Sequence, residues 1–171
     1  MASRSLAQAL RQHHGIEHAT VTLLTQRVPG ARVVAHSDLE GFTVFGDVET
    51  ATLRAVVEEA LTRLQRGESG LAVHPNCGTN LVAAGTLAGL SALALAAGRN
   101  RPWWDRLPAA VAGATLAIIF AMPVGQWLQA NITTSAEVAG LRVASITRFA
   151  DGPVARHRVI IGLQTEEPIT A

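Results

Sequence analysis

Apolar positions recur with helical spacing in two stretches of the first 70 residues. Leu6, Leu10, Ile16, Val21 and Leu24 predict a helix over 3–26, which Ser3 or Ser5 can cap and "VPG" at 28–30 ends. A second helix is predicted over 49–66, because its apolar positions make a single stripe ended by "RGESG". That stripe consists of Leu53, Val56, Val57, Ala60, Leu61 and Leu64.

Short runs rich in β-forming residues flank turn sequences at two places. Residues 32–36 and 41–45 lie on either side of "SDLEG", and residues 141–149 and 155–163 lie on either side of "ADGPV". Each pair predicts a β-hairpin.

Two long stretches between these hairpins carry no charge. They are residues 81–98 and 107–127, separated by "RNRPWWDR", whose Trp and Arg residues favour a lipid headgroup interface. We interpret them as a transmembrane helical hairpin. The alternative is a buried helix pair in a soluble protein, but the remaining residues are too few to cover both helices. Gly85 and Gly89 allow close helix approach and hint at a homo-oligomer.

The predicted fold class is α+β, a membrane protein with a two-helix hairpin and a small α+β domain. We expect an N-terminal α+β region over 1–78, the hairpin over 79–130, and a C-terminal β-hairpin over 131–171 that packs on the N-terminal region. With two spans, both outer parts lie on one side of the cell membrane. We place them in the cytoplasm, because the N-terminus does not resemble a signal peptide. The arginines of the interhelical loop favour the opposite orientation.

Composition supports a membrane location and narrows the function. The apolar fraction is 49% and the charged fraction 16%, so the lipid bilayer is an expected partner. The net charge is +1 and no basic stripe is present, so nucleic acid is not an expected partner. The single Cys excludes an internal disulfide and leaves a free thiol or a metal ligand.

A cluster of metal-ligating residue types lies in the first helix, in "HHGIEH" at 13–18. His14 and His18 are four residues apart, so both imidazoles can reach one ion from the same helix face. Glu17 between them completes His-x-x-Glu-His, the reverse of the zincin motif, and can act as general base. His13 points about 100° away from His14, which suits a supporting or surface position. A plain polar helix surface is the alternative.

The second cluster is "HPNCGTN" at 74–80, just before the first span. His74 and Cys77 flank a short turn and are predicted to join His14 and His18 around zinc or another divalent metal. The alternatives are a hydrogen-bonded turn imidazole and a buried thiol. Thr79 and Asn80 either bind substrate or cap the transmembrane helix. His36 and His157 lack ligand-spaced companions and are expected on the surface.

The two motifs, together with "LQANITT" at 128–134 after the second span, resemble an uncharacterised family of small bacterial membrane proteins. That family is similar to a wider group that pairs HGxEH with HPxCGT and is described as predicted metal-dependent enzymes. The resemblance covers most of the chain and implies a metal and a membrane. It also implies that Thr133 and Thr134 lie near the site. Asn76 and Asn80 depart from the wider group, so no substrate preference carries over.

Three functions are compatible with these residues. The first is a membrane-anchored, zinc-dependent hydrolase in which Glu17 activates water to attack a membrane-proximal peptide, lipid or amide. The second is a non-enzymatic scaffold or assembly protein, whose structural zinc is closed by His14, His18, His74 and Cys77. The third is a metal or redox sensor that uses Cys77. The number of ligands and the position of Glu17 discriminate between the first two.

Overall fold

The computed structural model of the chain describes residues 5–97, 102–150, 152 and 154–164. It divides into two compact units. The sheet unit comprises Met1–His74 and Ile132–Ala171, and the helical-pair unit comprises Pro75–Asn131. The fold class is α+β, as the sequence predicts, with an antiparallel sheet and two long apolar helices.

The sheet unit begins with α1, Leu6–Arg27, which corresponds to the helix predicted over 3–26. The side chain of Ser5 caps it by accepting a hydrogen bond from the backbone N–H of Gln8 (3.1 Å). Its C-cap residue is Val28. One face of α1 contributes apolar residues such as Ile16 and Leu24 to the core. The helix as a whole also buries several polar residues, which are Gln12, His13, Glu17, His18 and Thr20.

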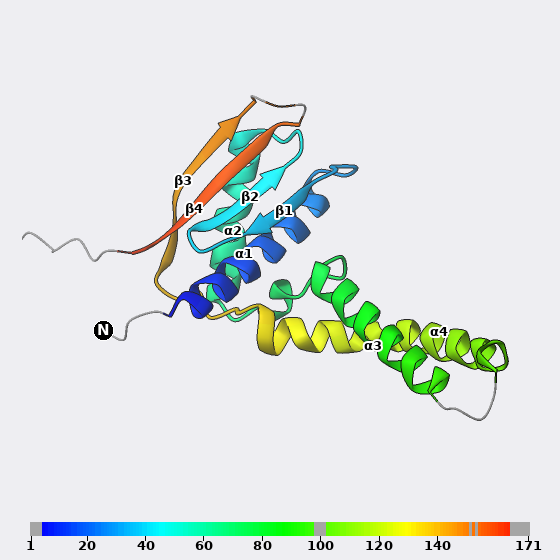
Figure 1. The fold of residues 1–171 in the computed structure, drawn as a ribbon. Helices are drawn as coiled ribbons and strands as arrows, with labels where there is room; N and C mark the ends of the chain where they lie inside the picture. Colours follow the sequence, from blue (N-terminus) through cyan, green and yellow to red (C-terminus); the bar gives the residue numbers. More distant parts are fainter. Residues whose placement is uncertain (1–4, 98–101, 151, 153, 165–171) are drawn as a thin grey trace, which may run out of the picture. The chain divides into compact units, whose positions relative to one another are not determined.

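The four-stranded sheet joins the two predicted hairpins. Its strands are β1 (Val34–Ser37), β2 (Gly41–Phe45), β3 (Leu141–Phe149) and β4 (Arg156–Leu163), in the order β1-β2-β4-β3 and all antiparallel. The central pairing of β2 with β4 sets Phe42 opposite Val159. Residues distant in the sequence therefore form the middle of the sheet (Figure 1).

Two helices and the inner side of the sheet enclose the core. The predicted apolar stripe forms one side of α2, Thr50–Gln65, and all of its members are buried. These residues pack in one cluster with Ile16 and Leu24 of α1, Phe42 of β2 and Val159 of β4. A short 3-10 helix, Ser69–Ala72, follows α2 and leads to His74. The core thus fixes α1 and the segment before His74 within the same unit.

The helical-pair unit contains α3, Gly78–Ala96, and α4, Trp103–Leu128, followed by the π-helix Gln129–Thr133. They include the predicted span 107–127 and residues 81–96 of the predicted span 81–98; Ala97 is the C-cap of α3, and residue 98 lies outside the described residues. The Trp pair lies in the first turn of α4 rather than in the preceding loop. By length and composition, Gly78–Ala96 and Trp103–Thr133 are long and apolar enough to cross a membrane. Only 11% of each apolar window is buried, whereas the core helix of a soluble protein is mostly buried.

His157 corrects one prediction, because it is fully buried instead of lying on the surface. Strand side chains alternate between faces, and His157 shares the inner face of β4 with Val159 and Ile161. Its Nε2 lies 3.1 Å from the hydroxyl of Thr50. Burial lowers the pKa of His157, the charge of Arg148 lowers it further, and Asp47 opposes both effects.

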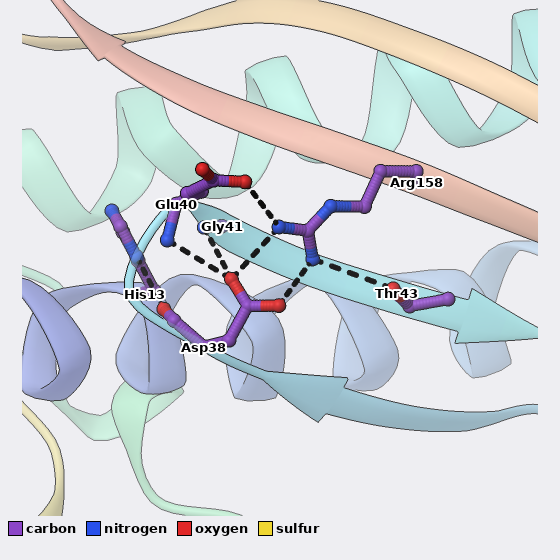
Figure 2. A network of polar contacts seen from close by, with 6 residues as sticks. All are labelled: His13, Asp38, Glu40, Gly41, Thr43 and Arg158. Carbon is purple, nitrogen blue, oxygen red and sulfur yellow. Dashed lines mark hydrogen bonds and ion pairs between the residues drawn. The ribbon is translucent and has the colours of Figure 1, made fainter.

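A polar network ties the β1–β2 turn to β4 and to α1 (Figure 2). Arg158 donates to both carboxylate oxygens of Asp38, at 2.6 and 2.8 Å, and one of these oxygens also accepts from the backbone N–H groups of Glu40 and Gly41. The carbonyl oxygen of Asp38 lies 2.8 Å from Nδ1 of His13. The hydrogen bond from Arg158 is the main reason that the pKa of Asp38 is lowered to about 2.

We predict that the sheet unit loses stability in acid through Asp38. The unfolded carboxyl binds a proton near its ordinary pKa of 3.8 and the folded one near 2, so its contribution is complete above pH 3.8 and is lost as the pH falls through 2. Since the Asp38 side chain is 44% exposed, screening limits the loss to about 1 kcal/mol. Urea unfolding followed by circular dichroism at pH 6 and pH 2.5 measures it. Asp38→Asn should reduce the pH dependence, and an unchanged dependence would contradict the assignment.

Candidate metal centre

Helix α1 brings two of the predicted ligands side by side. His14 and His18 lie one turn apart, and their ring centres are separated by 4.3 Å with the planes inclined by 64°. His18 is buried and His14 is half-buried. The i and i+4 positions alone produce this proximity, because residues four apart project from the same helix face.

Backbone carbonyls fix the orientation of both imidazoles. Nδ1 of His14 lies 3.0 Å from the carbonyl oxygen of Thr133, and Nδ1 of His18 lies 2.8 Å from that of Ala72. A carbonyl oxygen only accepts, so Nδ1 carries a hydrogen in both rings. Histidines that bind metals are commonly held in this way, with the second nitrogen donating to a carbonyl or carboxylate. In both side chains the ring is therefore oriented by Nδ1, as it is in metal-binding histidines.

His74 adds a third imidazole within the sheet unit. It follows the short helix Ser69–Ala72, whose last carbonyl holds His18, and its ring centre lies 5.8 Å from that of His18. Two imidazoles bound through Nε2 to one tetrahedral zinc have ring centres about 5 Å apart. The separation of 5.8 Å between His18 and His74 is close to this value, and that of 4.3 Å between His14 and His18 is shorter.

Cys77 belongs to the same loop, three residues after His74. At about 3.3–3.6 Å per residue, the chain keeps the two Cα atoms within about 11 Å of each other. The Cys77 side chain caps α3, and its sulfur accepts from the backbone N–H of Thr79 at 3.5 Å. Cys77 belongs to the helical-pair unit, whereas His14, His18 and His74 belong to the sheet unit, where His74 neighbours His18.

Glu17 is buried on the same helix as the two histidines, with 8% of its surface exposed. It precedes His18 and lies three residues after His14, so it shares that side of α1. Burying a carboxylate is strongly unfavourable unless hydrogen bonds, an opposite charge or a metal compensates.

The close packing around Gly15 explains why a glycine occupies this position between the motif residues. A Cβ atom at this position would lie 2.3 Å from the carbonyl oxygen of Ser135, so the backbone of the 133–137 segment occupies the space that a side chain would need. Two other residues of α1 donate hydrogen bonds to the same segment. Arg11 donates to the carbonyl of Thr134 from Nε and Nη2, and the side-chain amide of Gln12 donates to the carbonyl of Glu137.

The remaining predicted residues take different positions. His13 is buried, not exposed, and its ring faces the carbonyl of Asp38 (Figure 2). Asn80 is buried and donates to the carbonyl of Pro75 at 2.6 Å, while Thr79 lies in the first turn of α3. Thr133 and Thr134 meet α1 through their carbonyl groups.

Sequence reasoning did not identify the carbonyls of Ala72 and Asp38, because a backbone acceptor leaves no mark on residue type. Nor did it identify Gln12 and Gln129; for Gln129, a polar side chain at the end of a long apolar stretch was the available signal.

Comparisons with known proteins cover the same stretch of chain. The family described as "Domain of unknown function (DUF6391)" matches residues 9–146, which include both motifs. An uncharacterized protein of Picosynechococcus sp. is 36% identical over 136 residues, which is 74% of this chain and 66% of that protein. The match thus spans slightly less than two thirds of the relative's own length. No solved structure matches the chain.

We predict that Gly15→Ala disrupts the centre. The added methyl group would meet backbone atoms, so α1 must separate from the 133–137 segment, with a loss of about 1–3 kcal/mol in unfolding free energy. The hydrogen bond from His14 to Thr133 would weaken at the same time. Gly70→Ala is the matched control, since a Cβ there meets nothing within 4 Å. Equal unfolding midpoints for the two variants would contradict this packing.

Proposed function

The chain belongs to the family of the domain of unknown function DUF6391, and we propose that it is a membrane-anchored, zinc-dependent hydrolase. His14 and His18 would hold the metal together with a ligand from the loop at 74–77. The observation that carries the proposal is the common orientation of His14 and His18, whose Nδ1–H groups are both committed to carbonyls beside a buried Glu17. A polar helix surface would need neither the burial nor the fixed tautomers.

The donor set suits zinc better than harder cations. Imidazole nitrogens and a thiolate are the ligands of zinc sites, whereas magnesium and calcium prefer oxygen. Two histidines and Cys77 would be three protein ligands, one fewer than a closed tetrahedral structural site contains. Another divalent transition metal would fit the same donors.

Glu17 would be the general base of the reaction. A zinc ion bound by the imidazoles supplies Lewis acidity that makes water more acidic and polarises a carbonyl. The carboxylate of Glu17 would take a proton from the attacking water and deliver it to the leaving amine or alcohol, so that water is added across the cleaved acyl bond. General base catalysis of this kind contributes roughly 10²–10⁴ in rate.

The substrate would be a membrane-proximal peptide, lipid or amide. The loop with His74 and Cys77 runs directly into α3, and Thr133, which orients His14, is the last residue of the helix Trp103–Thr133. Both ends of the apolar hairpin are thus connected to the site by a few residues of chain. We propose that the sheet unit lies on the cytoplasmic side of the membrane.

A structural zinc site is the second candidate. It is favoured by the proximity of His74 to His18, because His14, His18, His74 and Cys77 would together complete a tetrahedral set. The ion would then fasten α1 to the loop, and the protein would act as a membrane scaffold or assembly factor. Glu17 would compensate the charge of the ion without contacting a substrate.

We predict about one zinc per chain in protein purified in detergent, and its loss in the double variant His14→Ala, His18→Ala. Each substitution removes an imidazole whose Nε2 would bind the ion, so metal content should fall at least roughly tenfold. Elemental analysis of the folded proteins measures it. His36→Ala is the control, because this exposed histidine lies on β1 and should leave the metal content unchanged. A folded wild type without metal would overturn the proposal.

We predict that Glu17→Gln keeps the zinc and loses hydrolysis by a factor of roughly 10²–10⁴. The amide has nearly the same shape as the carboxylate but cannot accept the proton. The measurement compares cleavage of fluorogenic acyl esters and peptide amides in mixed micelles, with metal content determined on the same samples. Zinc-loaded wild type without cleavage of either class would favour the structural site.

A further inference from the structure

We propose that Asn80, Gln129 and Gly125 form a clasp that holds the loop carrying His74 and Cys77. This inference concerns positioning residues and rests on the proposed role of that loop in metal binding. The three residues come from α3, from the π-helix after α4 and from the last turns of α4. Asn80 and Gln129 are buried, with 7% and 0% of their surfaces exposed, in a unit that is otherwise strongly apolar.

The two amides form a directed chain of hydrogen bonds. Nε2 of Gln129 donates to Oδ1 of Asn80 at 2.9 Å, and Nδ2 of Asn80 donates to the carbonyl oxygen of Pro75 at 2.6 Å. An amide has one accepting and one donating end, so the bond from Gln129 directs the NH₂ group of Asn80 toward Pro75. Pro75 stands between the two candidate ligands of the loop.

Gly125 provides the space in which the clasp forms. A Cβ at this position would lie 2.2 Å from Oδ1 of Asn80 and 2.9 Å from its Cα. A methyl group there must therefore displace the amide as well as the backbone of α3. Any larger residue at 125 would remove the geometry that lets Gln129 reach Asn80.

Burial of Asn80 and Gln129 favours their pairing with each other. An amide left without a partner in a buried position is costly, so the two amides are favoured to remain paired. A buried polar pair is not needed for two apolar helices to pack, since small residues already allow close approach. The two hydrogen bonds run from Gln129 through Asn80 to Pro75 in the loop. We therefore assign the amide pair to positioning of the loop.

The first experiment measures how fast the single cysteine reacts. Metal-free full-length protein in detergent is alkylated with a maleimide, and Gly125→Ala is compared with Gly113→Ala. Both variants insert a methyl between α3 and α4, but a Cβ at Gly113 meets the side-chain ends of Leu95 and Ser91 rather than Asn80. We expect Cys77 in Gly125→Ala to react roughly tenfold faster than in Gly113→Ala or wild type. Equal rates in the two variants would overturn the clasp.

The second experiment separates loop positioning from helix packing. The double variant Asn80→Leu, Gln129→Leu replaces both amides with apolar groups, so the thermal stability of the helices should stay near that of wild type. Cys77 should nevertheless react roughly tenfold faster, and zinc affinity, measured by competition with a chromophoric chelator, should fall to a similar degree. A wild-type reaction rate in this variant would overturn the clasp. Absence of zinc from wild type would overturn the metal site instead, while the alkylation rates still decide the clasp.

Discussion

The hydrogen bonds that leave the polar face of α1 are the constraint on which the site depends. His13, His14 and His18 each pair Nδ1 with a backbone carbonyl, and the three carbonyls belong to the β1–β2 turn, to the segment after α4 and to the short helix before His74. These segments are distant from one another in the sequence. One helix therefore holds all three segments, and the same bonds commit Nδ1 of His14 and His18 to carbonyl oxygens.

The core explains why this polar face can be buried at all. Ile16 and Leu24 of α1 pack against α2 and the inner side of the sheet, and this apolar packing offsets the desolvation of the neighbouring polar groups. The network of Asp38 and Arg158 then holds the β1–β2 turn whose carbonyl receives His13. Stability and site geometry consequently share the same residues, so the effects of substitutions at the site must be separated from effects on folding.

The apolar hairpin interrupts the sheet unit without breaking it. β3 and β4 follow the insertion at 75–131, yet β4 pairs with β2 from before it. Of the predicted site residues, His74 and Cys77 lie along the chain at the first junction of this insertion and Thr133 lies at the second. The apolar hairpin is thus joined to the sheet unit at two short junctions of the chain.

The sequence by itself determined the local elements and the paired motifs. The stripe from Leu53 to Leu64 and the two hairpins follow from periodicity, and His14 and His18 share a face because of their spacing. Only the tertiary structure decided what each polar side chain meets. His157 was expected on the surface, and strand pairing turned it into the core. The acceptors of His14 and His18 are carbonyls, which every residue possesses, so only the folded chain brings the right ones within reach.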